Sequence, residues 1–132
     1  MHAFIVELAN KPGSLAGLSA ALADREINIT GIAAATWGGS GSVGLITNDE
    51  AATRSILTAR GDTFRECDLV SASLENKPGT LANATRRLAD AGVNIDFLTP
   101  SGIDGNKITL AIGVDKAEVA RQALGELAAV GI

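Results

Sequence analysis

The chain repeats itself once, and this duplication limits its possible folds more than any other feature. When the 132-residue sequence is shifted by 66 positions, residues 8–29 align with residues 74–95. Twelve of these 22 positions are identical, namely Leu8, Asn10, Lys11, Pro12, Gly13, Leu15, Ala16, Leu22, Ala23, Asp24, Asn28 and Ile29. Self-similarity on this scale indicates two copies of one structural unit. We therefore expect two domains, residues 1–67 and residues 68–132.

Each copy begins with a pattern that predicts a strand, a turn and a helix. Alternating apolar residues with a period of two are typical of a strand with one packed face; here they are Phe4, Val6 and Leu8, and Val70, Ala72 and Leu74. A Pro-Gly pair then favours a turn. Apolar residues at helical spacing follow and predict a packed helix face, formed by Leu15, Leu18 and Leu22, and by Leu81, Ala84, Leu88 and Ala91.

The rest of each copy predicts two strands, a helix and a last strand. In the first copy we expect strands at 28–37, 42–47 and 63–67, with a helix that Asn48 or Asp49 caps and Gly61 closes. In the second copy we expect strands at 93–99 and 107–114 and a helix at 115–128. The order βαββαβ, with right-handed crossovers, predicts an α+β fold: ferredoxin-like antiparallel sheets with both helices on one face.

The second copy is shorter than the first at its end. After its last predicted helix only residues 130–132 remain, where the first copy has a complete strand. The fourth strand of the second unit is therefore expected to be missing or vestigial. Because a bare strand edge favours pairing with other chains, we expect another chain or another part of this chain to cover it.

The composition disfavours several classes of protein. Eleven Lys and Arg against 15 Asp and Glu give a net charge of −4 with no basic block, so we expect no nucleic-acid and no membrane partner. Residues 27–48 lack charge, but the Gly/Ser turn in their middle favours two strands over a membrane span. One cysteine, Cys67, excludes an internal disulfide, and the N-terminus lacks the pattern of a signal peptide. We expect a cytoplasmic protein.

Motifs for catalysis, metal or cofactor binding are weak. Residues 39–44 match G-x-G-x-x-G, but the third glycine enters a predicted strand rather than the helix that a dinucleotide site requires. His2, the one histidine, stands at the terminus, where we expect the chain to be frayed. Cys67 is expected to be an inert packed residue, and Trp37 either fills the core or lines an interface. We expect no cofactor, no metal and no enzymatic activity.

The hexapeptides at residues 10–15 and 76–81 are the strongest candidate for a binding site. Each joins a strand to a helix N-terminus, where unpaired N–H groups and a partial positive charge can hold a carboxylate. Glycine permits close approach of a ligand, and the asparagine amide offers both a donor and an acceptor. The alternative is that Pro-Gly only makes the turn and Asn starts it. Retention in both copies favours a ligand, although duplication alone also explains it.

Two βαββαβ units, each with N-K-P-G-[S/T]-L after its first strand and [I/V]-N-I before its second, resemble tandem ACT domains. The resemblance covers nearly the whole chain and is strongest to small stand-alone tandem ACT proteins. The hexapeptide also resembles the regulatory regions of aspartokinases and phosphoglycerate dehydrogenases. What the resemblance implies is a non-enzymatic regulator that binds a small ligand, most often an amino acid, between paired ACT units. It also implies a homodimer and a regulated partner protein.

The residues that the resemblance assigns to the ligand lie in the loops and at the starts of the second strands. They are Asn10, Pro12, Gly13, Ser14, Leu15, Asn28 and Ile29, and in the second copy Asn76, Pro78, Gly79, Thr80, Leu81, Asn94 and Ile95. Asn28 and Asn94 can instead be solvent-facing residues at a helix exit. The competing function is a structural or oligomerisation module without a ligand. A small hydrolase is a distant third, because no nucleophile and base converge.

Overall fold

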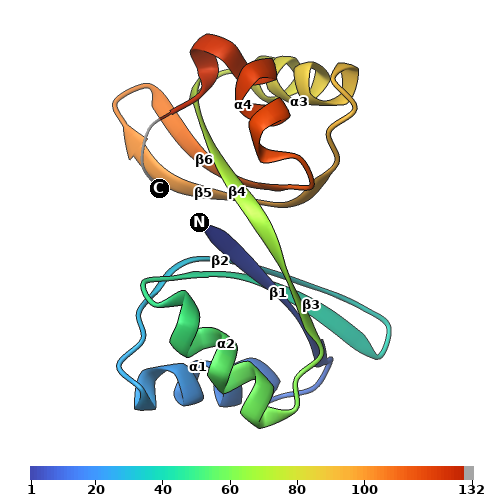
Figure 1. Ribbon diagram of the computed structural model, residues 1–132, viewed down its shortest axis with the longest axis vertical. Helices are drawn as coiled ribbons and strands as arrows, with labels where there is room; N and C mark the ends of the chain where they lie inside the picture. Colours follow the sequence, from blue (N-terminus) through green and yellow to red (C-terminus); the bar gives the residue numbers. More distant parts are fainter. Residues whose placement is uncertain (130–132) are drawn as a thin grey trace. The chain divides into compact units, whose positions relative to one another are not determined.

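The structure is a computed structural model that describes residues 1–129 (Figure 1). The chain divides into two compact units, one of His2–Glu66 and one of Met1 together with the residues from Cys67 onward. The elements are β1 (His2–Ala9), α1 (Ser14–Asp24), β2 (Ile29–Trp37), β3 (Ser40–Thr47), α2 (Glu50–Arg60), β4 (Phe64–Glu75), α3 (Thr80–Asp90), β5 (Ile95–Asp104), β6 (Lys107–Val114), α4 (Ala117–Leu124) and the 3₁₀ turn η1 (Gly125–Leu127).

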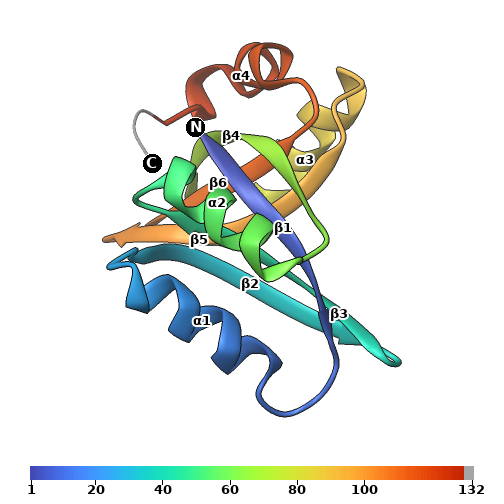
Figure 2. The same ribbon diagram turned by 60° about the horizontal axis from the view of Figure 1, so that its bottom comes forward.

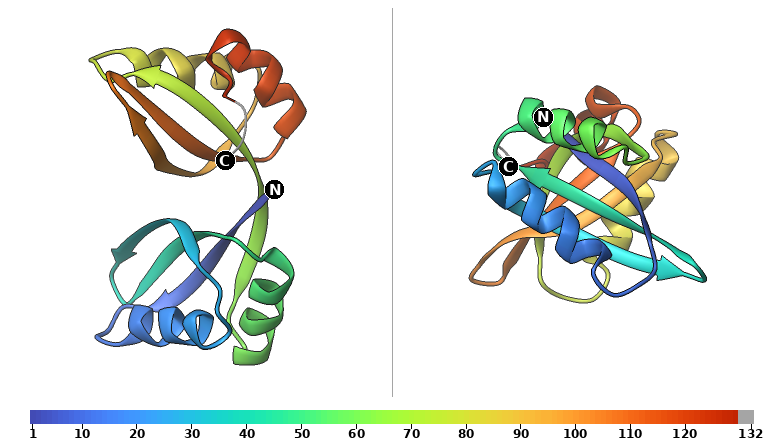
Figure 3. Two further views of the ribbon diagram at one scale, coloured as in Figure 1. Left: turned by 90° about the vertical axis from the view of Figure 1, so that its left-hand side faces the viewer. Right: turned by 90° about the horizontal axis from the view of Figure 1, so that it is seen from below.

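The first unit confirms the predicted α+β fold. Its strand order is β2-β3-β1-β4, and β1 pairs antiparallel with β3 from Phe4 opposite Leu45 to Ala9 opposite Ser40. β2 and β3 form a long antiparallel hairpin (Figure 2). Both helices, α1 and α2, cover one face of these strands (Figure 3).

The core of the first unit lies between its strands and the two helices. The alternating side chains of β1 meet the apolar faces of both helices, so that Phe4, Leu22 and Leu57 are fully buried. Full burial of one such side chain is worth about 1.5–3 kcal/mol relative to exposure. The period-two and helical patterns therefore predicted this core correctly, except in the first turn of α1.

The second unit has the order β5-β6-β4, and its helices α3 and α4 again cover one face (Figure 3). β4 is one continuous strand whose first three residues belong to the first unit and whose remainder belongs to the second. Its register with β6 runs from Asp68 opposite Val114 to Glu75 opposite Lys107. The last strand of one copy and the first strand of the next are thus a single element.

Among residues 1–129 the fourth strand of the second unit is vestigial, as the sequence predicts. It is represented by one bridge between Ala72 and Ala128, and the Ala129 N–H donates to the Ser71 carbonyl at 2.8 Å. The Met1 carbonyl accepts the Leu69 N–H at 3.1 Å. Parts of this chain therefore pair with that edge of β4 at these points. Residues 130–132, the predicted remnant, lie outside the described residues.

The termini of α2 follow the predicted capping. The Asp49 carboxylate accepts the Ala52 N–H at 3.0 Å, and Gly61 ends the helix in the left-handed conformation at φ 76°. The expectation of a frayed N-terminus is wrong, because the His2 backbone N–H donates to Glu50 at 3.2 Å within strand β1.

The last helix and the first helical turns differ from expectation. α4 ends at Leu124 rather than near residue 128, because Gly125 adopts a positive φ of 55° and a 3₁₀ turn follows. Leu15 and Leu81 are not on the packed helix face, since their side chains are 40% and 47% exposed. Ala91 is exposed because it follows the last residue of α3.

Candidate functional site

The two hexapeptide loops have nearly the same backbone. Gly13 and Gly79 precede α1 and α3 at φ 92° and 91°, a left-handed conformation that glycine adopts without steric strain. Neither helix start has a side-chain cap or an acidic residue in its first turn. The Lys11 carbonyl accepts the Ser14 N–H at 3.3 Å, but no side chain of either loop neutralises the partial positive charge at the helix start.

In the first unit, Asn10 fastens the loop to the turn between β2 and β3. Its side-chain Nδ2 donates to the Gly38 carbonyl at 2.7 Å, and its backbone N–H donates to the Gly39 carbonyl at 3.1 Å. Because a carbonyl can only accept, the amide nitrogen must face Gly38, and the Oδ1 atom remains as an acceptor. One side chain thus positions the loop and offers a polar atom.

A cavity of about 140 Å³ adjoins this loop. It lies where the first turn of α1 meets β1, β2 and β3, and it accounts for the exposure of Leu15. Its lining consists of Leu8, Ala9, Asn10, Lys11, Ser14, Leu15, Ala34, Ala35, Thr36, Gly41, Ser42 and Val43. A cavity of about 150 Å³ is large enough for a benzene molecule, so this one can receive a small organic group.

Small residues on the strands create this space. Gly41 pairs with Leu8 on β1 and with Thr36 on β2, and Ala34 pairs with Val43. A Cβ atom on Gly41 would lie 3.0 Å from the Thr36 side chain and from the Ala35 carbonyl oxygen, so a larger residue would press on β2. The cavity therefore depends on the tertiary packing of strand residues far from the loop in sequence.

The second loop has the same backbone but satisfies its own polar groups. The Thr80 hydroxyl donates to the Glu75 carbonyl at 2.7 Å and lies 3.1 Å from the Lys77 carbonyl. The Lys77 ammonium lies 2.9 Å from the Glu75 carboxylate, and this hydrogen bond lowers the pKa of Glu75. The first unit has Ala9 at the position of Glu75, so Lys11 lacks the same partner.

The remaining predicted residues lie at the far end of each helix. Asn28 and Asn94 follow α1 and α3, and each backbone N–H donates to a side-chain oxygen, of Asn48 at 2.9 Å and of Asp115 at 3.0 Å. An 11-residue helix is about 16 Å long. Within one unit the loop and the start of the second strand are therefore separated by the length of the helix.

The structure thus brings only some of the predicted residues together. Asn10, Ser14 and Leu15 line the cavity of the first unit. Asn94 and Ile95 line an open groove of about 490 Å³ along the side of α3. Asn28, Ile29 and the residues of the second hexapeptide line neither this cavity nor this groove.

Sequence reasoning missed most of the cavity lining. Lys11 stands inside the repeated hexapeptide, and its conservation in both copies was a usable signal. The run of small residues at 33–35 was a second signal, because a strand of alanines leaves space beside it. Gly41 gave no usable signal, since only the strand register shows that it faces Leu8.

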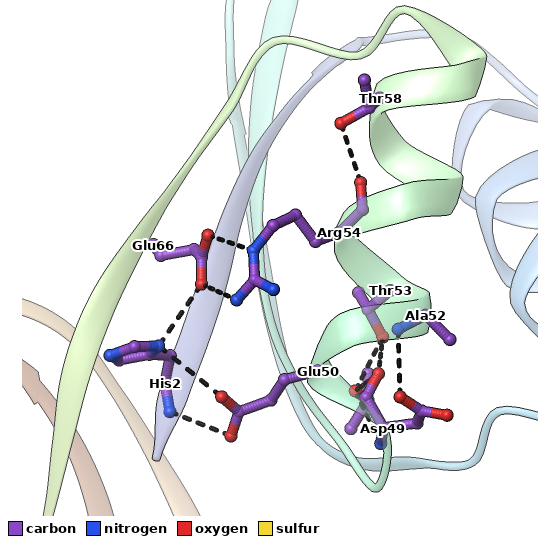
Figure 4. Close-up of polar contacts among 9 residues, drawn as sticks. His2, Asp49, Glu50, Ala52, Thr53, Arg54, Thr58 and Glu66 are labelled. Atoms are coloured by element: carbon purple, nitrogen blue, oxygen red, sulfur yellow. Dashed lines mark hydrogen bonds and ion pairs between the residues drawn. The ribbon is translucent and has the colours of Figure 1, made fainter.

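The other candidates from the sequence do not line the cavity. Trp37 is 92% exposed at the end of β2, so the interpretation as core filler is wrong. Cys67 is a buried cysteine that forms no disulfide. His2 lies 3.3 Å from Glu66, which Arg54 also binds through two hydrogen bonds of 2.6 and 2.8 Å (Figure 4).

Within residues 1–129 no cluster of three metal-binding side chains occurs, and no helix is long and apolar enough to cross a membrane.

One βαββαβ unit is followed by a second copy whose last strand is vestigial, and each has a Pro-Gly loop that leads into an uncapped helix; this arrangement defines a tandem pair of ferredoxin-like domains. The family model described as an ACT domain pair matches residues 1–127. The chain therefore belongs to the ACT-domain family.

Solved structures support this fold. Protein BT0572 from Bacteroides thetaiotaomicron is 24% identical with a TM-score of 0.76, over 95% of this chain and 86% of that one. The regulatory subunit of aspartate kinase from Thermus thermophilus is 22% identical with a TM-score of 0.67, over 96% and 91%. The structure of the aspartokinase alpha and beta subunits is 24% identical with a TM-score of 0.68, over 96% of this chain and 91% of that one. No curated protein matches the sequence.

Proposed function

We propose that the protein is a non-enzymatic regulator that binds an amino acid between paired ACT units. The observation that carries this proposal is the cavity beside the first hexapeptide, which combines an apolar interior with Asn10 and Lys11 at its lining. Such a concave site with a few polar groups is the usual form of a small-molecule site. The similarity in fold between this chain and the regulatory subunit of an aspartate kinase supports a regulatory role.

The chemistry of the loop suits a zwitterion. The uncapped first turn of α1 and the Lys11 ammonium favour an α-carboxylate. The Asn10 Oδ1 atom, which the Gly38 contact leaves as an acceptor, suits an α-ammonium group. Both ligand charges thus find partners without a metal or a cofactor.

Pairing of units follows from the length of the helix. Asn28 and Ile29 belong to the predicted site, but α1 holds them about 16 Å from the loop of their own unit. They can contact the same ligand only if they come from a different unit. A ligand that touches two units stabilises their association by its differential affinity, typically about 1–3 kcal/mol. Ligand binding thereby favours association of the ACT units, and a partner protein recognises the associated form.

The competing function is assembly without a ligand, and one observation favours it. Trp37 and Ile103 occupy the ends of β2 and β5 and are 92% and 78% exposed. Large exposed apolar residues are typical of protein interfaces. An assembly module would use these residues and would have no need of the cavity.

Calorimetric titration with the twenty amino acids distinguishes these functions. We expect at least one to bind saturably, and Asn10→Ala to weaken it at least tenfold because the loop loses its contact with Gly38. Asn76→Ala is the matched control, since its loop is held by other bonds, and it should change affinity less than threefold. Light scattering with and without the ligand reports association. If no amino acid binds at millimolar concentration and the mass stays constant, assembly is the better function.

A further inference from the structure

We infer that the first unit selects an amino acid with a small, branched aliphatic side chain, and that this selection is made in the first unit alone. The inference rests on the proposed function and adds the class of ligand. It stands on the shape and lining of the cavity and on a comparison of equivalent strand positions in the two units.

The size of the cavity limits the side chain. A volume of about 140 Å³ is close to the roughly 150 Å³ that receives benzene, so an isopropyl, isobutyl or sec-butyl group fits. The pocket is partly open to solvent, since Leu15 in its wall is 40% exposed, so this volume limits the part of the side chain that enters, and an indole ring exceeds it. Since the cavity opens beside the loop, the polar end of the ligand stays at Asn10 and Lys11 while its side chain enters.

The lining excludes a charged side chain. Leu8, Leu15, Ala34 and Val43 provide apolar walls, and Lys11 is the one charged residue among the lining residues. A cationic side chain would meet a like charge and no carboxylate. An acidic side chain would compete with the ligand's own α-carboxylate for Lys11 and would lose water against apolar walls, which is unfavourable. A neutral hydrocarbon group has neither difficulty.

Equivalent ladder positions in the second unit carry larger residues. Leu8 pairs with Gly41, but its repeat equivalent Leu74 pairs with Ile108. Ala34 pairs with Val43, whereas Pro100 pairs with Leu110 at the corresponding place. Ile108 packs against the core of its unit, so side-chain atoms stand where the first unit has space. At these two ladder positions the second unit therefore leaves less space beside its loop than the first unit does.

The test is a calorimetric ranking of amino acids with a variant that fills the cavity. For the unmodified chain we expect valine, leucine or isoleucine to bind at least tenfold tighter than lysine, glutamate or tryptophan. Threonine has the shape of valine with an added hydroxyl and should bind more weakly than valine. Ala34→Leu should weaken valine binding at least tenfold. Ala51→Leu adds the same atoms to an exposed site on α2 and should leave affinity unchanged within twofold.

Each outcome bears on one proposal. Tightest binding by a charged or aromatic amino acid, tighter binding of threonine than valine, or normal valine binding by Ala34→Leu overturns this inference while the proposed function stands. Absence of any amino-acid binding overturns the proposed function itself. If Ala34→Leu fails to fold by circular dichroism, Leu15→Ala replaces it. That variant enlarges the cavity at an exposed side chain, and it should shift the ranking toward tryptophan; an unchanged ranking counts against the inference.

Discussion

The loops at residues 10–15 and 76–81 share four consecutive residues, nearly one backbone conformation and a backbone hydrogen bond from the asparagine to the following hairpin turn, yet their side chains make different contacts. In the first, Asn10 reaches across to Gly38, and a cavity lies beside the loop. In the second, the Thr80 hydroxyl and the Lys77 ammonium both bond Glu75. The comparison teaches that a repeated motif determines local geometry, whereas its neighbours determine whether that geometry can receive a ligand.

The neighbours that matter are few. Ala9 in place of Glu75 leaves Lys11 without the carboxylate that holds Lys77. Gly41 in place of Ile108 opens the space beside the first strand. The residues at two positions outside the loop therefore decide whether the loop adjoins a cavity, as in the first unit, or bonds mainly to itself, as in the second.

The largest expected effect tests whether the two units are alike in their cores. Leu22 and Leu88 are equivalent in the repeat, and both are fully buried. We expect Leu22→Ala and Leu88→Ala each to lower the free energy of unfolding by about 2–5 kcal/mol, through lost burial and a residual cavity. Urea denaturation measures both. Leu81 is half-exposed, so Leu81→Ala is the control and should lower the free energy of unfolding by less than about 1 kcal/mol. If Leu22→Ala or Leu88→Ala also lowers it by less than about 1 kcal/mol, the two cores are not equivalent.

A smaller effect separates the two loops themselves. Thr80→Ala removes the hydroxyl that bonds the Glu75 and Lys77 carbonyls, so it should lower stability by about 0.5–1.5 kcal/mol and leave ligand affinity unchanged. Ser14→Ala alters a cavity-lining residue, so it should change stability by less than about 0.5 kcal/mol and weaken binding. Thermal unfolding and titration of both variants measure the two quantities. The reverse pattern would mean that the second loop carries the ligand.

The smallest expected effect is on the pH dependence of stability in acid. The Arg87 guanidinium, 2.7 Å away, lowers the pKa of Glu126 from 4.5 to about 2. Because the folded-state pKa is depressed, the stabilisation from this pair is present above pH 4.5 and is lost as the pH falls from 4.5 to about 2. Arg87→Gln should therefore flatten the pH dependence of unfolding in that window. Arg54→Gln is the counterpart in the first unit, where Arg54 lowers the pKa of Glu66; equal acid profiles for wild type and both variants would contradict the assignment.

The sequence predicted most of the fold because local patterns agreed with one another. Alternation at Phe4, Val6 and Leu8 predicted a strand, and Asp49 and Gly61 marked both termini of α2. The prediction for the last helix was wrong because apolar spacing continues past Gly125, while its positive φ ends the helix. Leu15 fits the helical period, but the cavity lies beneath its turn, and periodicity cannot show what lies below a helix face.

Within this chain, the amino-acid sequence alone determined the duplication, the order of elements and the left-handed glycine before each first helix, since these depend on short-range sterics and on the period of apolar residues. Tertiary structure decided which loop adjoins open space. That space depends on strand register, which sets Gly41 against Leu8 and Ile108 against Leu74. Register brings residues about 30 positions apart into contact, and no local pattern in the chain encodes the volume left between them.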